Sequence, residues 1–231
     1  MNKLVFTEED LPQKSSAWLD KRTKHIGGSD MAILTGDLPS FFDTAFDLFE
    51  RKIGKKPPKV MNAAMMRGAG MEDEARLYIE RHLRDVFNIK ASFEPLVAVH
   101  PHCEALMVSF DGVDIKNKIF AEIKCQSEKN FTKTIKTGMP SYYKAQVQSQ
   151  ASVANAHWGV TDGFFCSYYP EPVEISMTEE LDGIKTKSKI TTQLACIPVQ
   201  HDAEYSKYLH KLATSFQAMV DAKEWNPYWD L

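Results

Sequence analysis

A series of short apolar segments, with helical stretches before and after them, is the feature that most limits how this chain can fold. The segments are PLVAVH, ALMVSF, IFAEIKC, GVTDGFFCSYY, PVEISM and LACIPV. Each has the length and the β-branched or aromatic content that is typical of a strand. Strands with helices at both ends predict an α/β or α+β fold, in which helices flank a mixed central sheet.

The helices are predicted from apolar spacing and from capping residues. Gly68 and Gly70 weaken the start of the helical stretch AAMMRGAGMEDEARLYIERHLRDVF, which favours a start near Met71. A helix that follows the Gly-Gly break in HIGGSD is expected to take Ser29 or Asp30 as its N-cap. The other expected helices cover residues 15–22, 42–54, 142–156 and 203–223.

The composition is that of a chain that folds as one unit. With 231 residues, 43% of them hydrophobic, it can bury a sizeable core, and the absence of repeats or a low-complexity linker predicts a single domain over residues 1–231. No stretch has the apolar length of a bilayer span or of a signal peptide, which predicts no membrane association and a cytoplasmic location. The cysteines lack zinc-ligand spacing, in keeping with a reducing compartment: Cys103, Cys125, Cys166 and Cys196.

Candidate catalytic residues lie in the stretch FDGVDIKNKIFAEIKCQ. Side chains two apart on a strand share a face, so Glu122 and Lys124 are expected to point together, with Phe120 and Ile123 facing the core on the other side. Asp111, on the preceding strand of a hairpin that turns near IKNK, can lie across from Glu122. Two carboxylates and a lysine are the groups that metal-dependent hydrolysis of a phosphodiester requires.

An ordinary charged hairpin is the alternative interpretation of this stretch. Acid-x-Lys triplets also occur at 50–52, 114–116 and 221–223, so the triplet alone does not distinguish the two. Glu122 differs from these in its strongly apolar strand, where a charge costs several kcal/mol unless it is paired or bound to a metal.

Further polar residues have both a functional and a structural interpretation. Glu72 offers a third carboxylate or belongs to a solvated first helical turn. Arg22 and Ser29 lie on either side of the Gly-Gly turn and can hold a phosphate at a helix N-terminus, or they are a surface arginine and a plain cap. Gln146 and Gln150 share one helical face and can reach a nucleotide or water.

Five stretches in one order make the chain similar to a known family. They are WLDKRTKHIGGSD, RGAGMEDEAR, VSFDGV, AEIKC and YYKAQVQ. It resembles the lambda-exonuclease-like phage recombination nucleases, the alkaline exonuclease family, which is a branch of the restriction-endonuclease-like fold. The resemblance extends from Trp18 to Gln148. After Gln148 only the expected pattern of elements agrees.

The resemblance implies a role for each candidate residue of the reaction site. Asp111 and Glu122, with the backbone carbonyl of Ile123, fall on metal ligands, and Glu72 falls on a ligand of a second Mg²⁺, for which Mn²⁺ can substitute. Lys124 falls on the residue that orients or activates the attacking water. An active-site glutamine falls on Gln146.

The resemblance also implies residues that bind the DNA end. The pocket for a 5′-terminal phosphate falls on Arg22, Ser29 and Ser109. An apolar wedge between the terminal bases falls on Met65 or Met66.

The activity that the resemblance implies is 5′-to-3′ exonuclease digestion of linear double-stranded DNA. Such an enzyme releases mononucleotides and leaves a 3′ single strand. Members of the family are processive, ring-shaped homotrimers that work beside a single-strand annealing protein. A phage or prophage origin, in a bacterial host, fits this activity.

Charge and aromatic clusters give further expectations. The net charge of −3 counts against general DNA binding. A ring whose channel is lined by lysines, with an acidic outer surface, would reconcile this negative charge with DNA binding. Solvated loops are the alternative for both lysine clusters. The aromatic tail EWNPYWDL either docks another subunit or the annealing partner, or packs on its own domain. The candidate lining residues are Lys129, Lys133, Lys136, Lys185, Lys187 and Lys189.

Other functions compete with this one. An endonuclease of the same fold shares the acids and the lysine but cuts closed circles. A non-catalytic DNA-end-binding protein would not need the intact Asp111, Glu122 and Lys124, and an α/β protein with structural acids is the remaining alternative.

Overall fold

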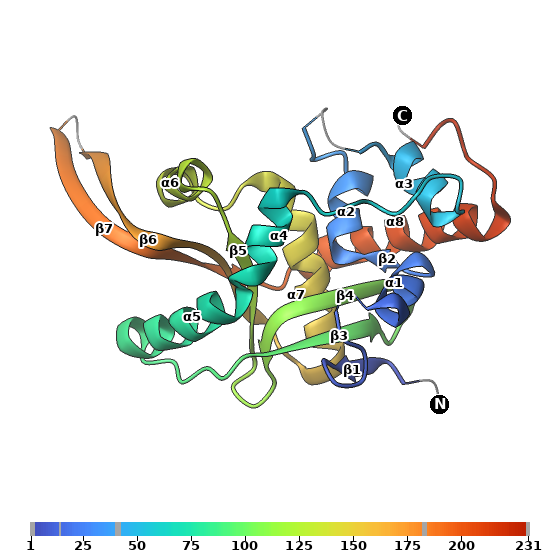
Figure 1. The fold of residues 1–231 in the computed structure, drawn as a ribbon, viewed down its shortest axis with the longest axis horizontal. Helices are drawn as coiled ribbons and strands as arrows, with labels where there is room; N and C mark the ends of the chain where they lie inside the picture. The colour runs from blue at the N-terminus through green and yellow to red at the C-terminus, as the bar shows by residue number, and fades with distance from the viewer. Residues whose placement is uncertain (1–2, 14, 40–42, 182–183, 230–231) are drawn as a thin grey trace.

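The centre of the molecule is one mixed β-sheet (Figure 1), as the sequence predicts. A computed structural model describes residues 3–13, 15–39, 43–181 and 184–229. The strands run in the order β1-β3-β4-β5-β6-β7, with β2 paired to β4. Their bounds are β1 Val5–Thr7, β2 Ile26–Gly27, β3 Glu94–His100, β4 Cys103–Asp114, β5 Ile119–Cys125, β6 Asp162–Leu181 and β7 Ile184–Gln200.

Helices cover the sheet. The helix expected to start near Met71 is confirmed as α5, which starts at Glu72, but a separate helix that was not predicted, α4, precedes it. Gly27, rather than Ser29 or Asp30, is the N-cap of α2, because Asp30 lies in the first turn and accepts a hydrogen bond from the Gly27 N–H (2.9 Å). The bounds are α1 Ser16–Thr23, α2 Gly28–Leu34, α3 Ala45–Lys52, α4 Ala63–Gly70, α5 Glu72–Phe87, α6 Glu128–Thr137, η1 Ser141–Tyr143, α7 Lys144–Trp158 and α8 Ala203–Ala222.

The strand that carries the candidate site lies in the middle of the sheet. β5 is antiparallel to β4 and parallel to β6, and the crossover between β5 and β6 contains α6 and α7. Gly112 of β4 pairs with Ala121 of β5. Asp111 and Glu122 are the next residues along the two strands, so the hairpin brings them to the same end of the ladder.

Two hydrophobic clusters pack on opposite faces of β5. Ile123 and Ala121 pack with residues of α5, whereas Phe120 packs with residues of α7 and α8. The expectation that Phe120 faces away from Glu122 was therefore wrong, since residues two apart on a strand share a face. Gly163 of β6 pairs with Phe120, and a Cβ at Gly163 would overlap the buried phenyl ring.

The β6–β7 hairpin extends well beyond the other strands (Figure 1). The segments GVTDGFFCSYY and PVEISM, expected as two strands, belong to one strand with a register shift between Tyr168 and Val173. The lysine-rich segment IKTKSKI, for which a loop was the alternative, is part of β7.

Two expectations from the composition can be compared with the structure. Cys103, Cys125, Cys166 and Cys196 are all free thiols. Among the described residues, no helix combines the length and the apolar character that a bilayer crossing requires.

Candidate active site

Glu122 is the centre of the candidate active site. The apolar strand β5 holds its side chain fully buried, and its partners among the described residues come from β5 and α7. Gln146 Nε2 donates to Glu122 Oε1 (2.6 Å), Gln150 Nε2 donates to Oε2, and the Lys124 ammonium pairs with Oε1. A buried carboxylate with three donors is not the solvent-facing Glu–Lys pair of an ordinary hairpin.

Asp111 lies beside Glu122 at the end of the β4–β5 ladder. Its Oδ2 accepts a hydrogen bond from the backbone N–H of Ile123 (2.8 Å). Burial and the neighbouring Glu122 carboxylate raise the pKa of Asp111 well above its usual range, and Lys124 opposes this. Two carboxylates held this close repel each other, so the pair favours the binding of a cation.

Lys124 supplies a fixed positive charge to the two acids. Burial alone would lower the pKa of its ammonium, but Glu122 and Asp111 outweigh burial and raise that pKa. The ammonium also lies 5.2 Å from the centroid of the Tyr143 ring. Lys124 is therefore a cation at neutral pH and can orient water or an anionic group.

Glu72 and Arg76 join the start of α5 to the site. Glu72 is half-buried and near enough to Asp111 to contribute to its raised pKa, as the sequence interpretation requires. One turn later, Arg76 Nε donates to the backbone carbonyl of Asp111 (2.8 Å), and its Nη1 pairs with Asp73 (2.7 Å). Arg76 was not predicted as a site residue, although its spacing of four from Glu72 places both on one helical face.

The donor set of this site fits Mg²⁺. Asp111, Glu122 and the Ile123 carbonyl are hard oxygen donors, the type that Mg²⁺ selects. Over the described ranges, no three His, Cys, Asp or Glu side chains are grouped as a ready-made metal cage. Mg²⁺ usually takes one or two carboxylates and keeps several waters, so two acids suffice for it.

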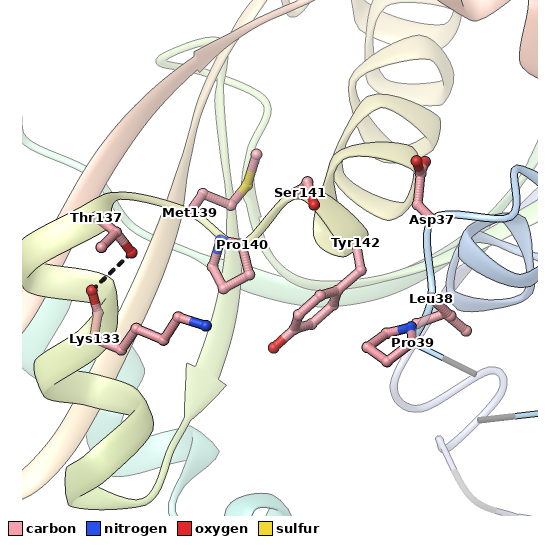
Figure 2. Close-up of a pocket in the computed structure, with 9 residues that line it drawn as sticks. All are labelled: Asp37, Leu38, Pro39, Lys133, Thr137, Met139, Pro140, Ser141 and Tyr142. Carbon is pink, nitrogen blue, oxygen red and sulfur yellow. Dashed lines mark hydrogen bonds between the residues drawn. The ribbon is translucent and has the colours of Figure 1, made fainter. Parts of the chain in front are cut away.

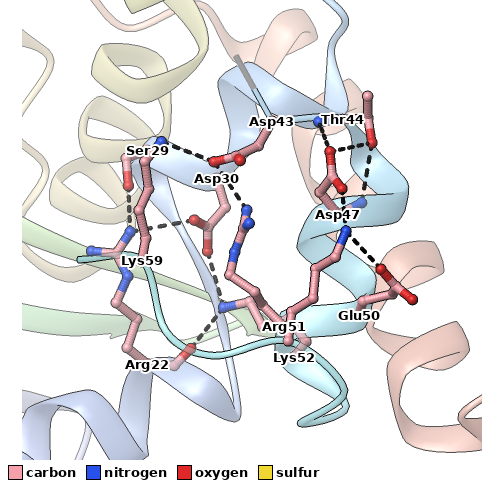
Figure 3. Close-up of polar contacts among 11 residues, drawn as sticks. Arg22, Ser29, Asp30, Asp43, Thr44, Asp47, Glu50, Arg51, Lys52 and Lys59 are labelled. Carbon is pink, nitrogen blue, oxygen red and sulfur yellow. Dashed lines mark hydrogen bonds and ion pairs between the residues drawn. The ribbon is translucent and has the colours of Figure 1, made fainter. Parts of the chain in front are cut away.

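Arg22 and Ser29 come together at the start of α2 (Figure 3). Arg22 Nη2 donates to Ser29 Oγ (2.5 Å) and to Asp30 Oδ1 (3.3 Å). Lys52 Nζ pairs with Asp30 Oδ2 (3.0 Å) and donates to the carbonyl oxygens of Arg22 (2.7 Å) and His25 (2.6 Å). Although burial opposes it, Lys52 and Arg22 hold the pKa of Asp30 well below its usual range.

Trp18 connects this cluster with Ser109. Its Nε1 donates to Ser109 Oγ (3.1 Å), and its ring lies 5.1 Å from the Arg22 guanidinium. α2 also packs closely on α7, because a Cβ at Gly28 would lie 3.6 Å from the carbonyl oxygen of Gln146. The fold therefore brings the predicted phosphate-binding residues to the neighbourhood of the carboxylates. Trp18 was not predicted as a site residue.

Met65 and Met66 lie on α4, with 42% and 57% of their surface exposed. α4 approaches the end of β5, where a Cβ at Gly68 would lie 3.5 Å from the carbonyl oxygen of Cys125. Cys125 directly follows Lys124, so both methionines lie on a helix that borders the site. An exposed apolar side chain in that place is available to a ligand.

The lysine clusters and the aromatic tail have definite positions. Lys129, Lys133 and Lys136 are exposed on α6, and Lys187 and Lys189 are exposed on β7, where Lys189 pairs with Glu174 (2.8 Å). The Lys185 side chain lies outside the described residues. In the tail, Trp225 packs on Phe46 and Phe49 and Trp229 packs on Phe216, so both rings contact their own domain.

Solved structures share this fold. LHK-Exo, an alkaline exonuclease from Laribacter hongkongensis, is 22% identical, with TM-scores of 0.63 (the complex with dAMP) and 0.62, and the match covers 90% of this chain and 94% of that one. A phage-related exonuclease from Haemophilus somnus 129PT is 12% identical, with a TM-score of 0.55 and coverage of 86% and 94%. The fold is that of phage-type exonucleases.

The sequence itself shows the family of the chain. It matches the YqaJ-like viral recombinase domain over residues 17–157, more than half of its length. The chain belongs to the YqaJ-like viral recombinase family, which confirms the resemblance to phage recombination nucleases. No curated protein matches the sequence.

Proposed function

We propose that this protein is a Mg²⁺-dependent exonuclease that digests linear double-stranded DNA from its 5′ ends. It releases 5′-mononucleotides and leaves a 3′ single strand for recombination by strand annealing. The observation that carries the proposal is the buried Glu122, held by Gln146, Gln150 and Lys124 beside Asp111. Exonuclease structures with the same fold and the viral recombinase family support it.

The carboxylates of Asp111 and Glu122, with the Ile123 carbonyl, would hold one Mg²⁺, and Glu72 would contribute to a second. When bound, the metal lowers the pKa of a coordinated water and neutralises charge on the scissile phosphate. Lys124, which pairs with Glu122, would orient the attacking water or the phosphate. Gln146 and Gln150, which donate to the Glu122 carboxylate, hold it in place.

The polarity is proposed from Arg22, Ser29 and Ser109. A terminal 5′ phosphate accepts paired hydrogen bonds from the Arg22 guanidinium and further ones from the two hydroxyls. Seating the terminal phosphate there fixes which phosphodiester bond lies at Asp111 and Glu122. Met65 or Met66, exposed on α4, wedges between the terminal bases and separates the strands.

The proposal extends to the assembly. A homotrimeric ring around the duplex would give processivity, with Lys187, Lys189 and the lysines of α6 facing the DNA, and a single-strand annealing protein would take up the product strand. Sedimentation equilibrium measures the oligomeric state directly. A monomer at micromolar concentration would contradict the ring and leave the chemistry of the site untouched.

Digestion of a labelled duplex tests the function. The substrate is a linear, 5′-phosphorylated duplex, labelled at the 5′ end of one strand and the 3′ end of the other, mixed with a closed circle and Mg²⁺ or Mn²⁺. Early release of the 5′ label as mononucleotide, with the circle intact, is expected. Early loss of the 3′ label would overturn the polarity. Nicking of the circle would make the protein an endonuclease, and no cleavage with either metal would leave an end-binding protein.

A further inference from the structure

A cleft of about 470 Å³ opens between the segment after α2 and the turn that joins α6 to α7 (Figure 2). One wall is formed by the Tyr142 ring, with Met139 and Pro140 beside it, and Pro39 lies on the opposite side. Figure 2 shows the side chains of Lys133 and Tyr142 extending into the same open space. The cleft thus combines an aromatic ring, apolar walls, the Lys133 cation and the Asp37 carboxylate.

The cleft lies close to the active site. The rings of Tyr142 and Tyr143 are 4.5 Å apart, and the Tyr143 ring is 5.2 Å from the Lys124 ammonium. A strand of DNA advances about 3.4 Å per nucleotide, so a strand at Lys124 reaches Tyr142 within about three nucleotides. A ligand in the cleft can therefore belong to the same DNA molecule that is cut at Lys124.

A row of lysines leads to the cleft along α6. Lys129, Lys133 and Lys136 follow the spacing that puts side chains on one helical face, and all three are exposed. Phe131 and Thr134, on the opposite face, are buried and attach the helix to the body. Within the described part of the chain, no acidic side chain pairs with these lysines. Unpaired cations in a row suit a phosphate backbone.

The chemistry of the cleft distinguishes an unpaired nucleotide from a base pair. Within a duplex, neighbouring bases cover both faces of each base, so only an unstacked base can stack on a protein ring. Burial raises the pKa of Tyr142 to about 12, with Tyr143 adding to it, so the ring carries no charge that repels a phosphate. Asp37 also lines the cleft. Its negative charge repels a phosphate on that side, so the phosphate is expected next to Lys133.

We propose that this cleft binds an unpaired nucleotide of single-stranded DNA, with its base on Tyr142 and its phosphate at Lys133. The inference rests on the proposed function and deepens it. Digestion of one strand leaves the other without its partner, and the cleft is the place where that remaining strand leaves the active site. The lysines of α6 then guide it outward.

Binding of a fluorescent oligothymidylate single strand, in EDTA to prevent cleavage, tests the role of the ring. Tyr142→Ala is expected to weaken binding about tenfold, because base–aromatic stacking is lost. Tyr142→Phe keeps the ring and is expected to bind like the natural protein. Equal affinities of the Tyr142→Ala variant and the natural protein would overturn the proposal.

The salt dependence of the same binding tests the phosphate contact. Lys133→Ala is expected to reduce the slope of log affinity against log salt by about 0.7, the value for one phosphate contact on a single strand. Lys207→Ala is the matched control, because Lys207 is exposed on α8 and pairs with Glu204 (2.6 Å). Because Lys133 is exposed, Lys133→Ala is expected to fold. It therefore still tests the proposed site if Tyr142→Ala does not fold. An unchanged slope for Lys133→Ala would reject the site.

Digestion of the linear duplex by the same proteins separates this inference from the proposed function. If the natural protein digests DNA from 5′ ends but binds single strands independently of Tyr142 and Lys133, the cleft assignment is wrong and the function stands. If binding depends on both residues but no duplex is digested, the cleft stands and the exonuclease assignment is wrong.

Discussion

At the scale of single residues, the site is a buried carboxylate surrounded by donors. Asp111, Glu122 and Lys124 could be predicted to converge, because strand periodicity and a short hairpin determine where they point. Trp18 and Arg76 were missed, since their contacts to Ser109 and to the Asp111 carbonyl join segments that are distant in the sequence. The spacing of four from Glu72 places Arg76 on the same helical face, but it does not indicate which distant backbone carbonyl Arg76 contacts.

Asp111→Asn is expected to abolish digestion and to stabilise the metal-free protein. Burial and Glu122 raise the pKa of Asp111, so its charged form at neutral pH costs folding free energy, which the amide does not. A gain of about 1 kcal/mol would raise the Tm by about 2–4 °C. Asp85→Asn, at an exposed position, should change neither the Tm nor the digestion rate. A lower Tm for Asp111→Asn would contradict this explanation.

Lys52→Met is expected to disturb the Arg22–Ser29 cluster. Removing the buried ammonium leaves the buried Asp30 with only Arg22 as a cation, at a cost of about 3 kcal/mol in unfolding free energy. Arg22 should then shift toward Asp30 and away from Ser29. The ratio of digestion rates for 5′-phosphorylated and 5′-hydroxyl ends is expected to fall severalfold.

The neighbouring Lys56 provides the control for that substitution. Lys56 is exposed and pairs with Asp47 and Glu50, so Lys56→Met should leave the ratio unchanged. Equal ratios for Lys52→Met and the natural protein would show that Lys52 does not position Arg22.

At the scale of elements, most strands and helices were predicted, but not every boundary. The start of α5 next to Met71 was predicted from Gly68 and Gly70, whereas the separate helix α4 before it was not. The Asn62 side chain caps α4 by accepting a hydrogen bond from the Met65 N–H (2.9 Å), which stabilises this short helix despite its two glycines. The segments GVTDGFFCSYY and PVEISM were expected as two strands, whereas β6 continues through Pro170 and Pro172 with a register shift.

Gly163→Ala is expected to destabilise the pairing of β5 with β6. A methyl group at Gly163 would overlap the Phe120 ring, which is fully buried and cannot move aside, at a cost of about 1–3 kcal/mol. Urea unfolding measures this loss.

Gly70→Ala is the matched control, because a Cβ at Gly70 has nothing within 4 Å. In a helix, that change should be neutral or stabilise by up to about 1 kcal/mol. If both alanine variants unfolded at the same urea concentration, the close approach at Gly163 would not matter.

At the scale of the whole molecule, histidines gather where α7 and α8 pack near β3. The rings of His100 and His210 are 4.3 Å apart, and His210 Nε2 forms a hydrogen bond with Ser152 Oγ (2.8 Å). Burial, together with the nearby His210, lowers the pKa of His100 to about 4, and burial also lowers the pKa of His210 and of His201. The packed state therefore requires these rings to be neutral.

Stability is accordingly expected to fall as the pH falls from about 6.5 to about 4. In that window the unfolded chain, whose histidines keep a pKa near 6.5, binds protons that the folded His100 does not bind. The Tm measured at several pH values should decline less steeply for His100→Gln. His102→Gln, at an exposed position, should follow the natural protein. If the Tm of all three proteins declined in parallel as the pH falls, His100 would be excluded as the cause of the acid destabilisation.

The parallel pairing of β5 with β6 also affects how the protein is made. β5 carries Glu122 and Lys124. The α7 helix, with Gln146 and Gln150, follows β5 in the chain, and so does β6, the strand that pairs with β5 in parallel. During synthesis the ribosome therefore releases β5 before the segments that hold its buried carboxylate in place. In a translation product that stops before α7, the Glu122 carboxylate lacks two of its three hydrogen-bonding or ion-pairing partners.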